Sequence, residues 1–119
     1  GVLTVSSSVG EQGQGAEAVF AQIAADAVGV SIDRVRVVTG DTDTTPYGGG
    51  TWASRGAGIG GEAVLQAGRV LRENILAVAE AILKGFPKVQ SVTITVHKPQ
   101  APIGALARDI GIVLSRCRT

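Results

Sequence analysis

Residues 62–84, EAVLQAGRVLRENILAVAEAILK, form the longest stretch of this chain with an unbroken helical period. Apolar residues recur along it at three- and four-residue steps, which predicts one core-facing stripe made of Val64, Ala67, Leu71, Ile75, Val78 and Ile82. Lys84 followed by Gly85 supplies a cationic last turn and a stop. The stretch therefore predicts a long amphipathic helix that packs on the rest of the chain.

Upstream of this helix the pattern is strand, helix, strand. Residues 2–5 form a short apolar run, and residues 16–28, AEAVFAQIAADAV, carry one apolar helical face that ends at Gly29, a residue suited to a left-handed cap. Residues 34–38, RVRVV, alternate charged and apolar side chains as a half-buried strand does. A strand, a helix and a second strand of these lengths predict a right-handed βαβ unit with parallel strands.

Downstream of the long helix, residues 91–96 (SVTITV) and 109–114 (DIGIVL) alternate in the same way. The connection between them contains two prolines, so we expect an antiparallel pair closed by a wide loop. The order β-α-β-α-β-β predicts a two-layer α/β (α+β) fold, with two helices on one face of a four-stranded mixed sheet. A length of 119 residues predicts a single domain.

Composition excludes several functional classes. The chain is 45% hydrophobic and 18% charged, and no apolar run approaches the roughly 20 residues that cross a bilayer, so we expect no membrane span. Basic residues near the C-terminus lie singly rather than in a cluster, which argues against nucleic acid. Cys117 is the single cysteine and His97 the single histidine, so we expect neither an internal disulfide nor a zinc site. Without a signal-peptide pattern, a cytoplasmic location is expected.

Two glycine-rich segments are candidates for binding. Residues 10–15, GEQGQG, precede a helix and could aim backbone N–H groups at an anion, although an ordinary glycine turn explains them as well. Residues 40–61 hold eight glycines and show no period. A 22-residue link without structure indicates either a binding loop or an incorrect assignment of elements.

The segments EQGQGAEAVFAQIAADAVGV at 11–30 and VRVVTGDTDTTPYGGGTWASRGAGIGGEAVLQAGRVLRENIL at 35–76 carry a specific resemblance. Over residues 1 to about 84, the chain resembles the molybdopterin-binding large subunit of the xanthine dehydrogenase and aldehyde oxidase family. The resemblance implies that Gln14, in the motif Gly13-Gln14-Gly15, lies beside the cofactor and that residues 40–55 line the active-site domain. The family's catalytic glutamate belongs to a later motif that this chain lacks. We therefore expect neither a complete hydroxylase site nor retained molybdopterin.

The second half is similar to another family. SVTITVHKPQAPI at 91–103, together with SRCR at 115–118, resembles the C-terminal half of dihydroneopterin aldolases, over residues 85–119 or from 71 onward. That resemblance implies Lys98 as general acid/base and Glu73 as the carboxylate that holds the pterin, with Tyr47 in the place of an aldolase tyrosine from a neighbouring subunit. Each of these residues also has an ordinary explanation. Lys98 can be an exposed lysine, Glu73 can be the helical partner of Arg69, and Tyr47 can be part of a turn.

Three hypotheses follow. The first is a chimera joined near Lys84 and Gly85, with no complete active site, that self-associates through exposed strand edges. The second is an aldolase-like lyase that performs a retro-aldol cleavage without metal or cofactor. The third is a fragment that binds a molybdopterin-like or other anionic ligand through Gln14 and the 40–61 loop. The expected partners are further copies of the chain and a pterin, with no nucleic acid and no membrane.

Overall fold

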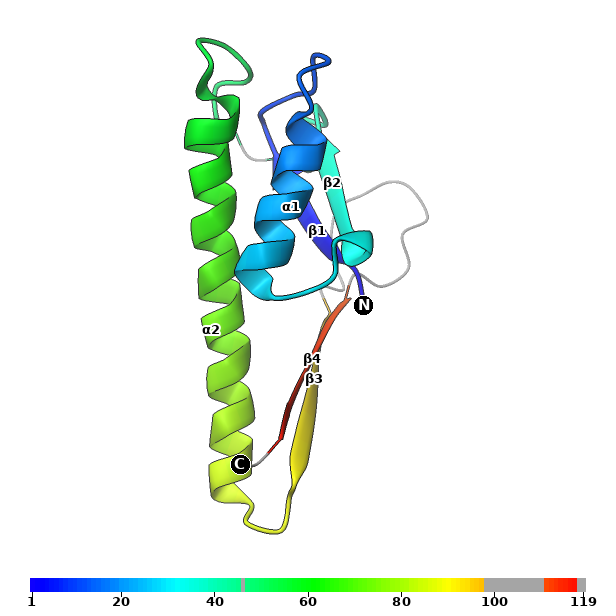
Figure 1. Ribbon diagram of the computed structural model, residues 1–119, viewed down its shortest axis with the longest axis vertical. Helices are drawn as coiled ribbons and strands as arrows, with labels where there is room; N and C mark the ends of the chain where they lie inside the picture. Colours follow the sequence, from blue (N-terminus) through cyan, green and yellow to red (C-terminus); the bar gives the residue numbers. More distant parts are fainter. Residues whose placement is uncertain (46, 98–110, 118–119) are drawn as a thin grey trace.

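The computed structural model describes residues 1–45, 47–97 and 111–117, and its helices and strands follow the predicted order (Figure 1). The main elements are β1 (Leu3–Ser7), α1 (Ala16–Val28), β2 (Val35–Thr39), α2 (Gly61–Gly85), β3 (Ser91–His97) and β4 (Gly111–Cys117). A short 3-10 helix (Ile32–Arg34) precedes β2, and a π-helical turn (Gly56–Gly60) in the link after β2 leads into α2. α1 has the predicted bounds, and Gly29 caps it in the left-handed region with φ 82°. α2 begins one residue before the predicted stretch and ends one residue after it.

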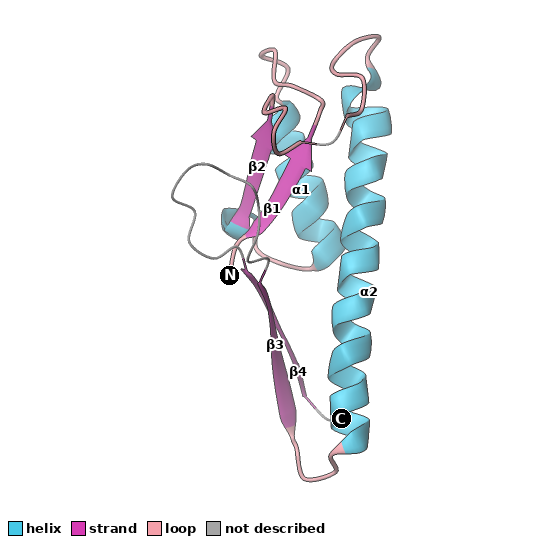
Figure 2. Ribbon diagram, turned by 180° about the vertical axis from the view of Figure 1, so that it is seen from behind, coloured by secondary structure: helices cyan, strands magenta, loops and turns pink. Residues whose placement is uncertain are grey.

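The predicted four-stranded mixed sheet is wrong. β1 pairs in parallel with β2, in register from Leu3–Val35 to Ser7–Thr39, and β3 pairs antiparallel with β4 in a separate two-stranded sheet. The cause is the length of α2, since its 25 residues extend about 37 Å. β3 begins beyond the far end of α2, and its seven residues run back only about 23 Å. The two sheets therefore lie one below the other along the same helix (Figures 1 and 2).

α2 packs on α1 through small residues, a feature that the predicted stripe only partly captures. Of the predicted stripe, Val64, Leu71, Ile75 and Ile82 are at least half-buried, whereas Ala67 and Val78 are exposed. Gly68, which was not part of the predicted stripe, is buried against α1. A Cβ atom built on it would lie 2.6 Å from the Cβ atom of Ala27. The helices thus meet more closely than any side chain at position 68 would allow.

The core has three clusters. One joins β1, α1 and α2 through Leu3, Ala24, Val28 and Ile75. A second holds Val9, Ala16 and the fully buried Phe20 beneath the loops, and a third joins the C-terminal half of α2 to β3 through Ala79, Leu83 and Val92. Ile94 of β3 packs against both the first and the third cluster. The hairpin is therefore connected to the βαβ unit through apolar contacts as well as through α2.

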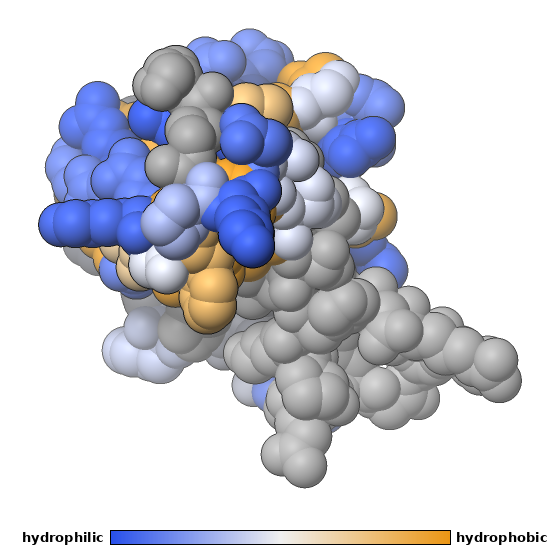
Figure 3. All heavy atoms as spheres, turned by 90° about the horizontal axis from the view of Figure 1, so that it is seen from below, coloured by the Kyte–Doolittle hydropathy of each residue, from blue (hydrophilic) through white to orange (hydrophobic). Residues whose placement is uncertain are grey.

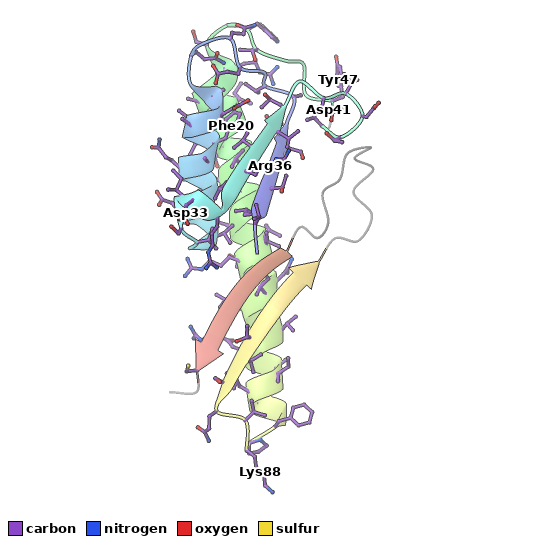
Figure 4. The ribbon with its side chains drawn as sticks, turned by 90° about the vertical axis from the view of Figure 1, so that its right-hand side faces the viewer. Phe20, Asp33, Arg36, Asp41, Tyr47 and Lys88 are labelled. Atoms are coloured by element: carbon purple, nitrogen blue, oxygen red, sulfur yellow. The ribbon has the colours of Figure 1, made fainter. Side chains whose placement is uncertain are left out.

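The lower face of the molecule is mainly polar in its described residues. Viewed from the lower end of Figure 1, the described residues present mostly hydrophilic side chains with separate hydrophobic patches between them (Figure 3). Glu80 pairs with Arg116 of β4, with 3.6 Å between Oε1 and Nη2, and both side chains are largely exposed. Lys88 lies in the turn at the lower end (Figure 4). No helix in the described part of the chain combines the length and the hydrophobicity that a bilayer crossing requires.

Candidate functional site

The parallel pairing of β1 and β2 brings the two glycine-rich loops to one edge of the molecule. The carboxyl ends of parallel strands lie at the same edge, and ligands of α/β sheets bind in the loops that follow them. Residues 8–15 follow β1 and residues 40–55 follow β2. The hydroxyl of Thr51 donates to the carbonyl oxygen of Gly10 at 2.7 Å and so connects the two loops. We refer to these two loops as the carboxyl edge.

The loop at residues 10–15 is folded around the carboxylate of Glu11. Its Oε1 accepts from the N–H of Gly13 at 2.8 Å and of Gly15 at 2.9 Å, and its Oε2 accepts from the N–H of Glu17 at 3.2 Å. The backbone N–H of Glu17, followed by that of Gly15, lowers the pKa of Glu11 below the usual glutamate range. A carboxylate of the chain itself therefore takes the place at the start of α1 that an anion would occupy.

Gln14 is exposed, yet both ends of its amide are engaged within its own loop. The Nε2 group donates to the carbonyl oxygen of Gly10 at 3.1 Å, and Oε1 accepts from the N–H of Gln12 at 2.6 Å. Gly13 and Gly15 have φ values of 91° and 77°, which permit this tight fold. Each end of the amide keeps one further hydrogen-bonding position, so Gln14 can also contact a ligand while both loop bonds stay in place.

A small hollow lies beside residues 40–45 and 47–50. Its volume is about 250 Å³, and its lining consists of hydroxyl side chains and glycines: Ser8, Gly40, Thr42, Thr45, Tyr47, Gly48, Gly49 and Gly50. Tyr47 is fully exposed and projects from the loop near Asp41 (Figure 4). The buried Oγ1 atom of Thr44 has no hydrogen-bond partner among the described residues, but Thr44 does not line the hollow. The polar side-chain groups that line it are the hydroxyls of Ser8, Thr42, Thr45 and Tyr47.

A strained turn follows this hollow, and it was not singled out from the sequence. Ala53 and Ser54 have φ values of 50° and 57°, in the left-handed region that non-glycine residues rarely adopt. The indole N–H of Trp52 donates to the carbonyl oxygen of Gly49 at 2.9 Å, and the guanidinium of Arg55 lies 5.5 Å from the centre of the Trp52 ring. Backbone strain of this kind concentrates at functional sites. Only the resemblance over residues 40–55 pointed to this turn.

The remaining candidate residues do not lie at the carboxyl edge. Glu73 is on α2, about 18 Å along the helix from its start, and lines a separate hollow with Asp26, Arg69 and Arg72. Its expected ion pair with Arg69 is not formed within the described residues. Lys98 lies outside the described residues. The structure therefore brings Gln14 and Tyr47 to one edge but does not bring Glu73 to it. Within the described ranges, His, Cys, Asp and Glu side chains form no group of three that could hold a metal ion.

Comparison with known proteins identifies the family. Residues 1–110 match the molybdopterin cofactor-binding domain. The xanthine dehydrogenase molybdenum-binding subunit of Escherichia coli O157:H7 is 36% identical over 111 residues, which is 89% of this chain and 15% of that protein. The large subunit of nicotine 6-hydroxylase from Paenarthrobacter nicotinovorans is 37% identical over 71% of this chain and 10% of its own length. The carbon monoxide dehydrogenase large chain of Afipia carboxidovorans is 38% identical over 61% of this chain and 9% of its own length.

These matches bear on the predicted junction. The family match continues past Lys84 as far as residue 110 and so includes most of the segment for which the sequence suggested an aldolase. Neither a chimera nor an aldolase segment is supported by the comparisons. The chain spans about 15% of the length of the Escherichia coli relative. It belongs to the molybdopterin cofactor-binding domain family.

Proposed function

We propose that this chain supplies one wall of a binding site for a molybdopterin-type cofactor, located at the carboxyl edge. The observation that carries the proposal is the meeting of the two glycine-rich loops, joined by the hydrogen bond from Thr51 to Gly10, around a hollow lined with hydroxyl groups. Family membership supports a molybdopterin-type ligand, and the parallel strands explain why the loops meet where they do.

The residues at this edge fit such a ligand. A pterin presents hydrogen-bond donors and acceptors along one edge, and its cofactor form also carries a phosphate. The hydroxyls of Ser8, Thr42 and Thr45 can bond either part. Gly50 has a φ value of 74°, and no atom lies within 4 Å of the position that a Cβ atom would take, so a ligand can approach its backbone closely. The bound cofactor would supply the redox chemistry, while the residues of this chain hold and orient it.

The lowered pKa of Glu11 bears on where the ligand's negative charge would lie. Because its carboxylate already accepts hydrogen bonds at the start of α1, a phosphate placed there would meet like charge. We therefore place the phosphate toward the hydroxyls of the 40–50 loop and the heterocycle toward Gln14. In this arrangement the Gln14 amide bonds the ligand through the donor and acceptor positions that its loop bonds leave open.

The chain would act within a larger assembly. The relatives are subunits or large chains several times longer than this chain, and their names assign them to xanthine dehydrogenase, nicotine hydroxylase and carbon monoxide dehydrogenase. We propose that oxidation of a small molecule is the activity of the whole assembly, in which this chain contributes cofactor binding. We also propose that residues 1–119 fold as one domain that associates with further subunits or copies.

Titration with 6-hydroxymethylpterin, followed by calorimetry, tests the proposal. Saturable binding is expected, with loss of affinity in Gln14→Ala and after deletion of residues 48–50. Gln22→Ala is the matched control, since Gln22 is an exposed glutamine on α1 away from the loops. A folded protein that does not bind the pterin, or that binds it equally well after both changes, contradicts the proposal.

The same titration separates the aldolase alternative, whose candidate residues are Glu73 and Lys98. That function requires binding to be lost in Glu73→Ala and kept in Gln14→Ala, and turnover of a dihydroneopterin to be lost in Lys98→Ala. Glu73 lies on α2 away from the carboxyl edge, so one protein cannot satisfy both patterns through a single site. Loss on Gln14→Ala alone supports the cofactor wall.

A further inference from the structure

One side chain holds the loop that carries Gln14. The carboxylate of Glu11 accepts hydrogen bonds from the N–H groups of Gly13 and Gly15, the two residues that flank Gln14 in the chain. Its other oxygen accepts from the N–H of Glu17, in the first turn of α1. α1 itself packs in the core. A single carboxylate therefore connects both sides of Gln14 to a fixed point of the fold.

The two glycines depend on these hydrogen bonds for their conformation. Glycine adopts more backbone conformations than any other residue, so it stays in one of them only when other contacts select it. Gly13 and Gly15 have φ values of 91° and 77°, and no atom of the described residues lies within 4 Å of the position that a Cβ atom would take at either. Packing at these positions is therefore open, and the bonds to Glu11 are the contacts that select the conformation.

The conformation of this loop also decides where the Gln14 amide points. The carbonyl oxygen of Gly10 accepts from Nε2 of Gln14 at 3.1 Å and from the hydroxyl of Thr51 at 2.7 Å. A carbonyl oxygen has two lone pairs, so the two bonds can form together. They join the Gln14 amide to the loop that follows β2. The held loop thus presents the remaining donor and acceptor positions of this amide in one direction.

The carboxylate of Glu11 is largely occupied by the loop itself. Oε1 accepts two hydrogen bonds and Oε2 accepts one, which leaves little capacity for a ligand. The N–H of Glu17, followed by that of Gly15, lowers the pKa of Glu11, so the group is ionised near neutral pH. An ionised oxygen accepts stronger hydrogen bonds than a neutral one. These features suit Glu11 to order the loop rather than to contact a ligand.

We propose that Glu11 is a positioning residue of the cofactor wall, whose carboxylate holds residues 10–15 in the conformation that directs the Gln14 amide toward the pterin. The inference rests on the proposed function, because the direction of this amide matters only if a pterin binds there. Without the carboxylate, the glycines on both sides of Gln14 are free to leave their conformation. Affinity then falls in proportion to the fraction of time for which the loop has the binding conformation.

A double-mutant cycle on the full chain tests the inference, with 6-hydroxymethylpterin as the ligand and calorimetry as the measurement. The parent chain is compared with Glu11→Ala, with Gln14→Ala and with the double variant. This pterin is uncharged at neutral pH, so loss of the charge on Glu11 does not by itself attract it. Glu62→Ala is the matched control, because Glu62 is an exposed glutamate at the start of α2 that also accepts a hydrogen bond, from Nε2 of Gln66. Circular dichroism checks that all variants are folded.

NMR of the free chain supplies a readout that does not depend on the ligand. In Glu11→Ala, the two Nε2 proton resonances of Gln14 should move toward the positions of an unstructured glutamine, because the loop no longer holds that side chain. In Glu62→Ala they should stay where they are in the parent chain. Resonances of Gln14 that do not move in Glu11→Ala overturn the inference.

In the titration, Glu11→Ala should weaken pterin binding about tenfold, as expected for a loop that keeps its binding conformation about a tenth of the time. Glu62→Ala should not weaken it. When Gln14 is already alanine, the further change at Glu11 should have no effect, since its action passes through Gln14. Equal weakening in both backgrounds overturns the inference, because Glu11 would then contact the ligand itself. Parent-like binding by Glu11→Ala overturns it as well, whereas a folded parent chain that binds no pterin overturns the proposed function and this inference together.

Discussion

The close contact between α1 and α2 predicts that Gly68→Ala destabilises the fold, although alanine is the better helix former. A Cβ atom at position 68 would lie 2.6 Å from the Cβ atom of Ala27 and 3.4 Å from Cγ2 of Val28. Carbon atoms in contact prefer about 3.5–4.0 Å, so the helices must separate by roughly 1 Å. Neither Cβ atom can rotate away, because each is fixed to its backbone.

The expected magnitude follows from two opposing terms. Overpacking costs about 1–3 kcal/mol, and the upper end applies here because the whole helix must move. The gain in helix propensity returns about 1 kcal/mol. We expect a net loss of about 2 kcal/mol in the free energy of unfolding, measured by urea denaturation with circular dichroism. Gly85→Ala, where no atom lies within 4 Å of the added Cβ, should change stability by less than about 0.5 kcal/mol.

A second substitution distinguishes steric overlap from other causes. Ala27→Gly removes the atom that the new methyl group would strike, so the double variant Gly68→Ala with Ala27→Gly should recover part of the loss. The coupling energy between the two changes should then favour the double variant by about 1 kcal/mol or more. Gly68→Ala as stable as the parent protein, or a double variant whose losses simply add, would refute this account of the helix pair.

The remaining predictions concern the loop, the core and the surface. Hydrogen bonds lower the pKa of Glu11 in the folded state, so its contribution to stability is complete above the usual glutamate pKa and is lost as pH falls through the lowered value. Glu11→Gln should therefore be less stable near neutral pH and lose less stability on acidification, a difference visible in urea midpoints measured from about pH 6 down to about pH 3. Phe20→Ala should lower the free energy of unfolding by about 3–5 kcal/mol in urea denaturation, because Phe20 is fully buried. A loss below about 1 kcal/mol would show that this side chain does not lie in the core. Arg116→Ala should lower the free energy of unfolding by about 0.5 kcal/mol or less, since its ion pair with Glu80 is exposed. A larger loss would indicate that the contact between β4 and α2 has a structural role.

Local patterns predicted the elements well, for reasons visible in single residues. The bounds of α1 follow from its apolar face and from Gly29, whose left-handed φ ends the helix as expected. The pairing of β3 with β4 follows from two alternating segments joined by a proline-containing connection. The element order was therefore available from the sequence.

Local sequence patterns could not predict which strands pair in one sheet. Periodicity gives each strand one apolar face but does not say which strands share a sheet, and the length of α2 decided that question. The buried stripe of α2 was misjudged at Ala67 and Gly68 because glycine carries no apolar signal, although its small size allows the close approach of α1.

The candidate site residues remain predictions. Gln14 was named from the resemblance to molybdopterin-binding subunits and Tyr47 from the resemblance to aldolases, and the structure brings both to one edge because β1 and β2 are parallel. The role of Glu11 was missed, since a carboxylate that folds back onto the loop looks in the sequence like any exposed acid. The role of Glu11 depends on the conformation of its side chain, which the residue type does not reveal.

The position of Trp52 has a practical consequence for following this protein in solution. It is the only tryptophan of the chain, and the residue is 62% exposed on the loop beside Gly49 and Arg55. Its fluorescence emission therefore reports on the strained turn and not on the packing around Phe20. A change in its spectrum without a change in circular dichroism would signal rearrangement of the loop alone, which gives the carboxyl edge a built-in optical probe that needs no label.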